Sequence, residues 1–195
     1  MVKKRMALFE RSTKETKIKA SLLLDGEGKC RIDTPCNMFN HLLSSMVKFS
    51  LFDLDIEAKN TLESDEHHLV EDVAICLGQA FDKALASRIG ISRFGFSLTP
   101  MDECLVLSSV DLSGRGGCYQ RLRFRSARIG DLSTSLIPHF FSSLAANGRF
   151  TMHLGVLRAG DEHHMAEALF KSAGLSLGSA SRIVGRNVPS TKGVL

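Results

Sequence analysis

The sequence has no tryptophan, one tyrosine and five cysteines, and its 195 residues include no apolar run near the roughly 18 residues that a membrane helix requires. The cysteines are odd in number and form no Cys-x-x-Cys pair, which favours a chain with reduced thiols in the cytoplasm. The N-terminus is basic, but no apolar stretch follows it, so no signal peptide is expected. We therefore expect neither a membrane protein nor a secreted, disulfide-rich domain.

The composition is that of an ordinary globular protein, with 44% hydrophobic and 24% charged residues. A net charge of +4 is mild and suits an anionic ligand at least as well as nucleic acid. The basic segment RLRFRSAR (121–128) occurs in a chain with one tyrosine and no tryptophan for base stacking, so no nucleic-acid partner is expected. Its alternation instead predicts a strand over 120–128 with an arginine-rich, solvated face.

A short motif occurs twice. DEHH stands at 65–68 and again at 161–164, each time with a glutamate three residues after the second histidine. Upstream of each copy, a histidine is followed by two bulky apolar residues and two serines, at His41 and at His139. The offset is 98 residues for this histidine and 96 residues for the paired ones. Such fixed self-similarity predicts a duplicated unit of roughly 90 residues.

Both copies of the unit predict the same order of elements, and together they are expected to form one pseudosymmetric domain. The expected boundaries are 1–195 for the domain, about 17–89 and about 104–183 for the repeats, and about 184–195 for a C-terminal arm. Gly-x-Gly-x-Cys stretches predict hairpin turns at 24–30 and 112–118. Apolar spacing predicts strands at 16–26, 51–59, 106–114 and 150–157, and helices at 39–50, 67–85, 136–145 and 163–180. Strands followed by helices, twice over, indicate an α+β fold of two sheets with helices packed on them.

Helix geometry indicates which side chains of the repeated motif can bind a metal ion together. In His-His-x-x-Glu, the first histidine and the glutamate are four residues apart and therefore lie on one face of a helix. The two histidines of a pair differ by about 100° around the helix axis and should not chelate one ion together. We therefore expect two metal sites, each with one histidine from each pair among its ligands. Six histidines and two glutamates then give three histidines and one glutamate per site, a set that suits Mn²⁺, Fe²⁺, Zn²⁺ or Co²⁺.

A plainer interpretation treats each motif as a solvated or N-capped helix start. Asp65 and Asp161 directly precede the motif's glutamate and paired histidines and are expected N-caps. A single copy would not separate these interpretations, whereas two copies with a third matched histidine favour metal ligation. His153 has no partner in the first repeat, so a structural role and a place beside the substrate both stay open.

Several further motifs extend over nearly the whole chain: DEHHLVED (65–72), RFGFSLTPMDE (93–103), VDLSGRGG (110–117), EHHMAEALFK (162–171) and VPSTKG (188–193). With them the chain resembles the imidazoleglycerol-phosphate dehydratase family of histidine biosynthesis. The resemblance implies a duplicated βαβ-type unit (ribosomal protein S5 domain 2-like) with two four-stranded sheets, and trimers that assemble into a 24-subunit homo-oligomer. It also implies two Mn²⁺ ions per active site, at subunit interfaces. The implied ligands are His41, His67, His68, Glu71, His139, His163, His164 and Glu167.

The family's reaction removes water from D-erythro-imidazole glycerol phosphate and yields imidazole acetol phosphate. Because the carbon-bound proton is not acidic and hydroxide leaves poorly, metal coordination of the imidazole ring is expected to help expel the hydroxyl. A carboxylate must also take the proton, and another group must protonate the departing oxygen. The resemblance places four carboxylates near the substrate, namely Glu15, Glu71, Asp102 and Glu167. We expect Glu167 to be the base and Glu15 to act on the leaving hydroxyl or on a diol.

The phosphate of the substrate is expected to meet residues whose charge and hydrogen-bonding groups suit its oxygens. The resemblance implies Arg93, Arg115, Lys171, Ser190 and Lys192. Among several departures from the family pattern, two affect the expected phosphate contacts, because a glutamine and a histidine expected on the first helix are Ser45 and Phe49 here. This change favours weak substrate binding, a related phosphate, or compensation by a cation such as Lys48. It also keeps a second hypothesis open, a metal-assembled structural or regulatory paralogue with little or no turnover.

Overall fold

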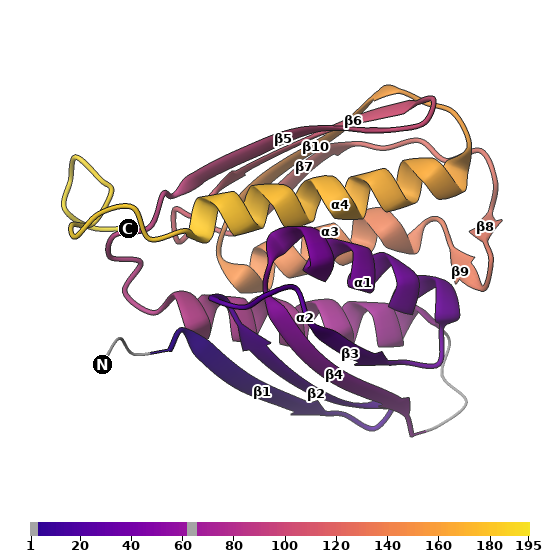
Figure 1. Ribbon diagram of the computed structural model, residues 1–195. Helices are drawn as coiled ribbons and strands as arrows, with labels where there is room; N and C mark the ends of the chain where they lie inside the picture. The colour runs from indigo at the N-terminus through magenta and orange to yellow at the C-terminus, as the bar shows by residue number, and fades with distance from the viewer. Residues whose placement is uncertain (1–3, 62–65) are drawn as a thin grey trace.

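The computed structural model describes residues 4–61 and 66–195, in which two four-stranded sheets enclose a layer of four helices (Figure 1). The predicted α+β fold of two sheets with helices packed on them is confirmed. The first half comprises β1 (Met6–Ser12), β2 (Thr16–Leu23), β3 (Cys30–Asp33), α1 (Asn37–Ser50), β4 (Asp53–Asn60) and α2 (Glu66–Leu85). The second half comprises β5 (Phe94–Met101), β6 (Cys104–Asp111), β7 (Gly117–Arg121), β8 (Arg128–Ile129), β9 (Leu132–Ser133), α3 (Leu136–Gly148), β10 (Thr151–Arg158) and α4 (Glu162–Ser181).

The two large sheets have the same topology. Their strand orders are β1-β2-β4-β3 and β5-β6-β10-β7, and in each sheet only the last pair is parallel. Each sheet includes one strand, β1 or β5, that precedes the expected start of its repeat at about Lys17 or Cys104. The structural unit in each half is therefore one strand longer than the repeat that the sequence displays.

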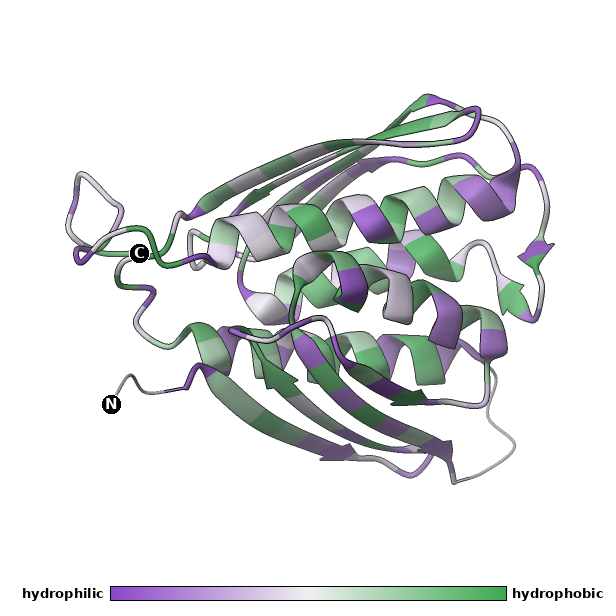
Figure 2. Ribbon diagram, in the orientation of Figure 1, coloured by the Kyte–Doolittle hydropathy of each residue, from purple (hydrophilic) through white to green (hydrophobic). Residues whose placement is uncertain are grey.

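The strands form because their side chains alternate between the helix layer and solvent. In β2, Ile18, Ala20 and Leu22 are buried while Lys17 and Lys19 are exposed. This period of two suits a strand with one face against a core. The same alternation is visible as bands of colour along the strands of both sheets (Figure 2). Each sheet thus covers one side of the helices with its apolar face.

The predicted hairpin turns at 24–30 and 112–118 are wrong. β2 and β3 both pair with β4, which lies between them, and β6 and β7 flank β10 in the same way. In the first half, Asp53 at the start of β4 accepts hydrogen bonds at Oδ1 from the backbone amides of Glu27 (2.8 Å) and Lys29 (2.9 Å). The glycine-containing loop is therefore held by the strand that it crosses over.

The four helices pack as two parallel pairs, α1 with α4 and α2 with α3. Small residues allow the close approach in each pair. A Cβ at Gly178 would lie 2.5 Å from the carbonyl oxygen of Ser50 on α1, and a Cβ at Gly78 would lie 2.8 Å from the carbonyl oxygen of Leu144 on α3. At Gly174, one turn earlier in α4, a Cβ would overlap the carbonyl oxygen of Met46. The two pairs also run in the same direction, so the first turns of all four helices lie at one end of the layer, on the right in Figure 1.

The predicted strand over 120–128 is also wrong beyond Arg121, where β7 ends. Residues 122–135, which we call the β8–β9 segment, have only residues 34–36 as their counterpart in the first half. The alternation of apolar and charged residues has another cause here, because Leu122 and Phe124 pack against the core from a loop. The backbone amides of Arg125 and Ser126 donate to the carboxylate of Glu162 and not to a neighbouring strand.

The β8–β9 segment joins the starts of three helices. It contacts α4 through the hydrogen bonds that Glu162 accepts from the amides of Arg125 and Ser126. Arg128 forms an ion pair with Glu66 at the start of α2, with N–O distances of 2.7 and 3.1 Å. Asp131 accepts hydrogen bonds from the backbone amides of Asn37 (2.7 Å) and Met38 (2.8 Å) at the start of α1. The segment then leads directly into α3.

Residues 184–195 form an irregular arm after α4. The amide of Val184 donates to the carbonyl of Gly90 (2.7 Å), and the carbonyl of Pro189 accepts from the Arg93 guanidinium (2.9 Å). The arm therefore lies at the C-terminal end of α4, opposite the gathered helix starts. Among the helices of the described chain, none has both the length and the apolar character needed to cross a bilayer.

Candidate functional site

Three side chains from two halves of the chain form what we call the Glu167 cluster: His41, His163 and Glu167. His41 lies on α1, and its Nε2 is 3.0 Å from Oε2 of Glu167 on α4. His163, one turn before Glu167, has its Nε2 3.4 Å from the same oxygen. The two imidazole rings stack with centroids 5.5 Å apart.

A matching Glu71 cluster consists of His67, Glu71 and His139. Here α2 supplies the histidine and the glutamate, with Nε2 of His67 3.8 Å from Oε2 of Glu71. The third member comes from α3, with Nε2 of His139 3.5 Å from Oε1 of Glu71. The rings of His67 and His139 stack with centroids 4.5 Å apart.

Each cluster therefore combines a histidine and a glutamate from one half of the chain with a histidine from the other half. The i, i+4 spacing in α2 and α4 brings the first two together, and the parallel helix pairing brings in the third. In both clusters one ligand atom from each residue lies within 4.8 Å of the others. Two imidazole nitrogens and a carboxylate oxygen at this separation fit a divalent transition-metal ion.

The second histidine of each pair lies outside the cluster that holds the first. The rings of His67 and His68 are nearly perpendicular, with an interplanar angle of 79°, and those of His163 and His164 make 82°. A complete set of three histidines and one glutamate is accordingly not assembled within one chain: the two clusters of the described residues hold two histidines each. His68 and His164 therefore lie outside both clusters, and the division of each pair between two ions stays a prediction.

His68 and His164 face carboxylates in equivalent loops. Nδ1 of His68 is 3.6 Å from Oε2 of Glu15, which lies between β1 and β2. Nδ1 of His164 is 3.6 Å from Asp102 and 3.3 Å from Glu103, which lie between β5 and β6. Glu15 and Asp102, both candidate catalytic residues, therefore occupy pseudosymmetric positions.

Glu103 is a candidate site residue that the sequence did not single out. Hydrogen bonds from the backbone amides of Asp161 and of Glu103 itself, together with His164, lower the pKa of Glu103 to about 2. In turn, the hydrogen bond with Glu103 raises the pKa of His164. His164, Asp102 and Glu103 each place one potential ligand atom within 4.8 Å of the others, in an exposed group that holds one histidine. The signal in the sequence is its position beside Asp102, at the end of the motif at 93–103.

Asp161 is confirmed as the N-cap of α4. Its Oδ1 accepts hydrogen bonds from the backbone amides of His163 (2.8 Å) and His164 (3.2 Å). This contact fixes the first turn of the helix and with it the direction of the paired histidines. The corresponding Asp65 lies outside the described residues.

Glu167 is held on both carboxylate oxygens. Oε1 is 2.9 Å from Nζ of Lys171 and accepts a 3.4 Å hydrogen bond from Ser45 Oγ, while Oε2 faces the two histidines. Burial raises the pKa of Glu167, but the hydrogen bonds with Lys171 and His41 outweigh it and lower the pKa to about 2. The carboxylate is therefore ionised at neutral pH.

The candidate phosphate-binding residues do not gather in one place. Lys171 lies beside the Glu167 cluster, and Ser45 and Phe49 lie next to it, with the Phe49 ring 5.6 Å from its ammonium. Arg93 precedes β5, whose far end carries Asp102, and an eight-residue strand spans roughly 23 Å. Arg93, Arg115, Ser190 and Lys192 lie at the end of the molecule that carries the C-terminal arm.

Arg93 is already engaged by a carboxylate. Its guanidinium forms a two-point ion pair with Asp111, with distances of 2.8 and 3.2 Å, and donates to Pro189 in the arm. Arg115 and Lys192 are exposed, and Ser190 Oγ accepts from the amide of Lys192. Within one chain, Lys171 is thus the single member of this set that contacts either histidine cluster.

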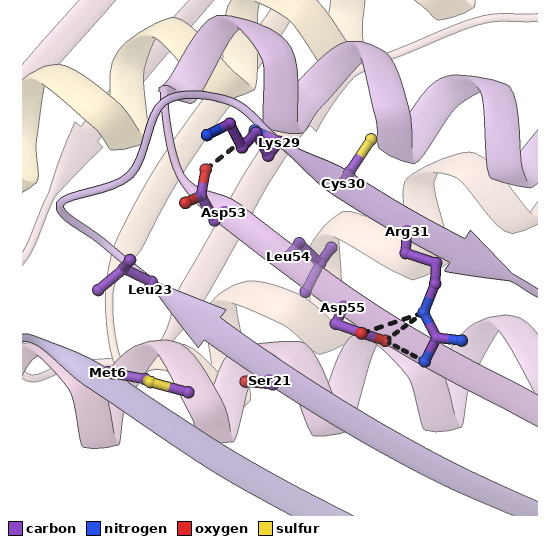
Figure 3. A pocket seen from close by; sticks show the side chains of 9 residues that line it. All are labelled: Met6, Ser21, Leu23, Lys29, Cys30, Arg31, Asp53, Leu54 and Asp55. Atoms are coloured by element: carbon purple, nitrogen blue, oxygen red, sulfur yellow. Dashed lines mark hydrogen bonds and ion pairs between the residues drawn. The ribbon is translucent and has the colours of Figure 1, made fainter.

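A hollow of about 400 Å³ on the outer face of the first sheet is unrelated to these clusters (Figure 3). Its lining includes Arg31, which is ion-paired with Asp55, and Asp53, which holds the β2–β3 loop. It contains no histidine, and the sheet separates it from the helix layer. His153, which has no counterpart in the first repeat, stacks on Tyr119 with centroids 5.0 Å apart and is exposed on the second sheet.

Comparison with known proteins places the chain in a family. The family model described as imidazoleglycerol-phosphate dehydratase matches residues 34–177. The imidazoleglycerol-phosphate dehydratase of Chloroflexus aggregans is 47% identical over 194 residues, covering 98% of this chain and 95% of that protein. The enzyme of Metallosphaera sedula is 49% identical over 185 residues, covering 95% of this chain and 96% of that protein.

Solved structures agree with the sequence relatives. The Pyrococcus furiosus enzyme, determined in complex with (S)-C348, has a TM-score of 0.83 and 34% identity, covering 95% of this chain and 99% of that one. The Staphylococcus aureus imidazoleglycerol-phosphate dehydratase has a TM-score of 0.82 and 29% identity, covering 91% and 99%. The resemblance found in the sequence is therefore confirmed. The chain belongs to the imidazoleglycerol-phosphate dehydratase family, the hydro-lyases that carry out this dehydration in histidine biosynthesis.

Proposed function

We propose that the chain dehydrates D-erythro-imidazole glycerol phosphate to imidazole acetol phosphate in the cytoplasm, with two Mn²⁺ ions per active site. The observation that carries the metal dependence is the pair of matching clusters, each with two imidazole nitrogens and one carboxylate oxygen within 4.8 Å. Such mixed nitrogen and oxygen donors suit Mn²⁺ and leave coordination positions for a substrate ring. Structural zinc sites, by contrast, commonly include cysteine.

The residues that would hold the ions come from more than one chain in this proposal. His67, Glu71 and His139 would hold one ion, and His41, His163 and Glu167 the other. His68 and His164 point out of these clusters and have side chains that are 44% and 34% exposed, so each can complete a site on a neighbouring subunit. This supports a homo-oligomer, with trimers assembling into a 24-subunit shell.

The bound metal would polarise the imidazole ring of the substrate and stabilise the negative charge that develops on it. The chain's carboxylates would move the protons. Glu167 is ionised and is our candidate base, with Glu71 in the equivalent position of the other cluster. Glu15 and Asp102, beside His68 and His164, would contact the leaving hydroxyl or the diol. A carboxylate with a low pKa is a weak base, so Glu167 gains basicity if Lys171 moves away from it.

The phosphate group would be bound by residues from two subunits. Lys171 is near the Glu167 cluster, whereas Arg93, Arg115, Ser190 and Lys192 are at the opposite end of their own chain. A neighbouring subunit would therefore present that end to the site. Guanidinium and ammonium groups suit a phosphate dianion, and the backbone amides of a glycine-containing loop can also approach it closely.

The test is a turnover assay with imidazole glycerol phosphate on protein that has been stripped with a chelator and then reloaded with Mn²⁺. We expect no turnover without metal and restored turnover with it. The double variant Glu71→Gln, Glu167→Gln should bind little Mn²⁺ and stay inactive. Full activity in the stripped protein, with metal removal verified, would contradict the proposal.

Ser45 and Phe49 support a second candidate, the metal-assembled paralogue with little or no turnover. Both residues lie beside Lys171 and Glu167, where the family pattern has a glutamine and a histidine. The same assay separates the candidates. Metal binding without turnover at saturating substrate favours the paralogue.

A further inference from the structure

The two clusters differ at one charged position. Lys171 follows Glu167 by one helical turn, and its Nζ lies 2.9 Å from Oε1 of that carboxylate. At the equivalent position in the first half, four residues after Glu71, stands Ile75. The ion-pair partners of Glu71 among the described residues are His67 and His139. Among the described residues, Glu167 therefore has an ammonium partner and Glu71 has none.

This difference acts directly on cation binding. The Glu167 side chain is only 11% exposed, and Lys171 occupies one of its two oxygens. A divalent cation entering this cluster would meet a positive charge a few ångströms away, which repels it strongly in a partly buried site. It would also compete with the ammonium for the same carboxylate. The Glu71 cluster presents its carboxylate to a cation without this competitor.

The ammonium has few other anchors. Besides Glu167, Nζ contacts the sulfur of Met101 at 3.6 Å and the ring of Phe49 at 5.6 Å, both weak partners. A lysine stem has four rotatable carbons, so the group can leave Glu167 without any backbone movement. Once released it is a partly desolvated cation with no carboxylate partner. An anion such as phosphate is the ligand that would hold it in the released position.

We propose that the two clusters are inequivalent cation sites, and that Lys171 couples the weaker one to an anion. The Glu71 cluster takes up a divalent cation first. The Glu167 cluster binds its cation when Lys171 turns to an anionic group, so cation and anion raise each other's affinity by the same factor. This inference rests on the proposed metal dependence and deepens it, because the phosphate of the substrate would then strengthen the second metal site.

The experiment is a Mn²⁺ titration of the full-length, metal-stripped protein, with free Mn²⁺ followed by its electron paramagnetic resonance signal. We expect two classes of site whose affinities differ by about tenfold or more, and saturating inorganic phosphate should tighten the weaker class by a similar factor. In Lys171→Met the weaker class should tighten without phosphate, and the phosphate effect should disappear. Lys171→Arg, which keeps the charge, should retain two distinct classes.

The reciprocal change supplies a matched control. Ile75→Lys places an ammonium one turn after Glu71 and should weaken the tight class, whereas Ile75→Met should leave it unchanged. Equal affinities in the unmodified protein, or two classes that Lys171→Met does not alter, would overturn the inference even if the chain is an active Mn²⁺ enzyme. Absence of Mn²⁺ binding, or turnover without metal, instead sinks the proposed function and this inference with it. Circular dichroism of each variant shows whether a change reflects folding.

Discussion

Asp131, in the β8–β9 segment, accepts a 2.8 Å hydrogen bond at Oδ1 from the backbone amide of Met38 in the first turn of α1. α1 has no side-chain cap of its own at Cys36, so this carboxylate from the other half of the chain does the capping. Replacing Asp131 by Ala should lower the free energy of unfolding by about 0.5–2 kcal/mol, the usual effect of losing a cap. Urea unfolding followed by circular dichroism measures it.

The same contact predicts a pH dependence. Burial raises the pKa of Asp131, but the hydrogen bonds from the amides of Met38 and Asn37 outweigh it and lower the pKa below its ordinary value of 3.8. Because the folded pKa is lowered, the stabilisation is fully present above the unfolded value and is lost as the pH falls through the folded value. The stability difference between the unmodified protein and Asp131→Asn should therefore shrink below about pH 4. A difference that stays constant from pH 7 to pH 3 would contradict the role given to this charge.

Gly178 should not tolerate a methyl group. In an open helix, Gly→Ala stabilises by about 1 kcal/mol. Here the added Cβ would lie 2.5 Å from the carbonyl oxygen of Ser50, so Gly178→Ala should instead destabilise by about 1–3 kcal/mol. Gly155→Ala is the control, because no atom lies within 4 Å of that Cβ. Thermal unfolding should show a lowered midpoint for Gly178→Ala alone.

His67→Ala and His68→Ala should remove metal from different sites. His67 belongs to the Glu71 cluster, whereas His68 points toward Glu15, so the two side chains cannot serve the same ion in one chain. Anomalous scattering from crystals grown with Mn²⁺ should show lost occupancy at one position in each variant, and the two positions should differ. Loss of the same ion in both variants would contradict the split.

Chelation should reduce the size of the assembly. If sites are completed by His68 and His164 of neighbouring subunits, metal binds only the assembled state and stabilises it by mass action. After metal is removed, light scattering should therefore show a smaller species, a trimer in our proposal, that returns to full size with Mn²⁺. An assembly of unchanged mass after verified metal removal would count against metal-linked subunit contacts.

The double replacement Ser45→Gln, Phe49→His should tighten substrate binding. Both residues lie beside Lys171, and the replacements restore two hydrogen-bonding groups, one of them worth about 1.5–3 kcal/mol if charge-assisted. We expect KM to fall by about one to two orders of magnitude, with kcat less affected. Metal content should stay the same, which controls for disturbance of Glu167. If KM does not fall, Lys48→Ala tests whether that cation already compensates.

Much of this architecture was accessible from the sequence because it depends on local spacing. The helices α2 and α4 match the predicted 67–85 and 163–180 within one residue, since their apolar residues recur with helical period. The divergence of paired histidines likewise follows from the turn of one helix. The incorrect predictions concern contacts between residues that are far apart in the sequence. The alternation at 121–128 looks like a strand, yet its amides bond to Glu162, and no local pattern shows that a distant carboxylate will compete for them.

The partners of the histidines were the least predictable feature. Spacing shows that His163 and Glu167 share a face, but it does not show that α4 packs beside α1 and so meets His41. Glycines at the helix contacts permit that pairing without specifying it. Helix spacing does predict the ion pair between Lys171 and Glu167. The lack of an equivalent ammonium partner for Glu71 becomes meaningful only when the structure shows that the two clusters match.

The exchange of histidines between the halves has a consequence for the origin of the chain. A chain with one unit would have a histidine on its first helix and a His-x-x-x-Glu face on its second helix. In the present fold these two groups of ligands contact the other half of the chain and not each other. An ancestor of half this length could therefore have built these clusters only as a pair of identical copies, and the twofold symmetry of that pair would have made both clusters identical. In one chain that carries both units this constraint does not apply, and the two clusters differ where Lys171 in the second half corresponds to Ile75 in the first.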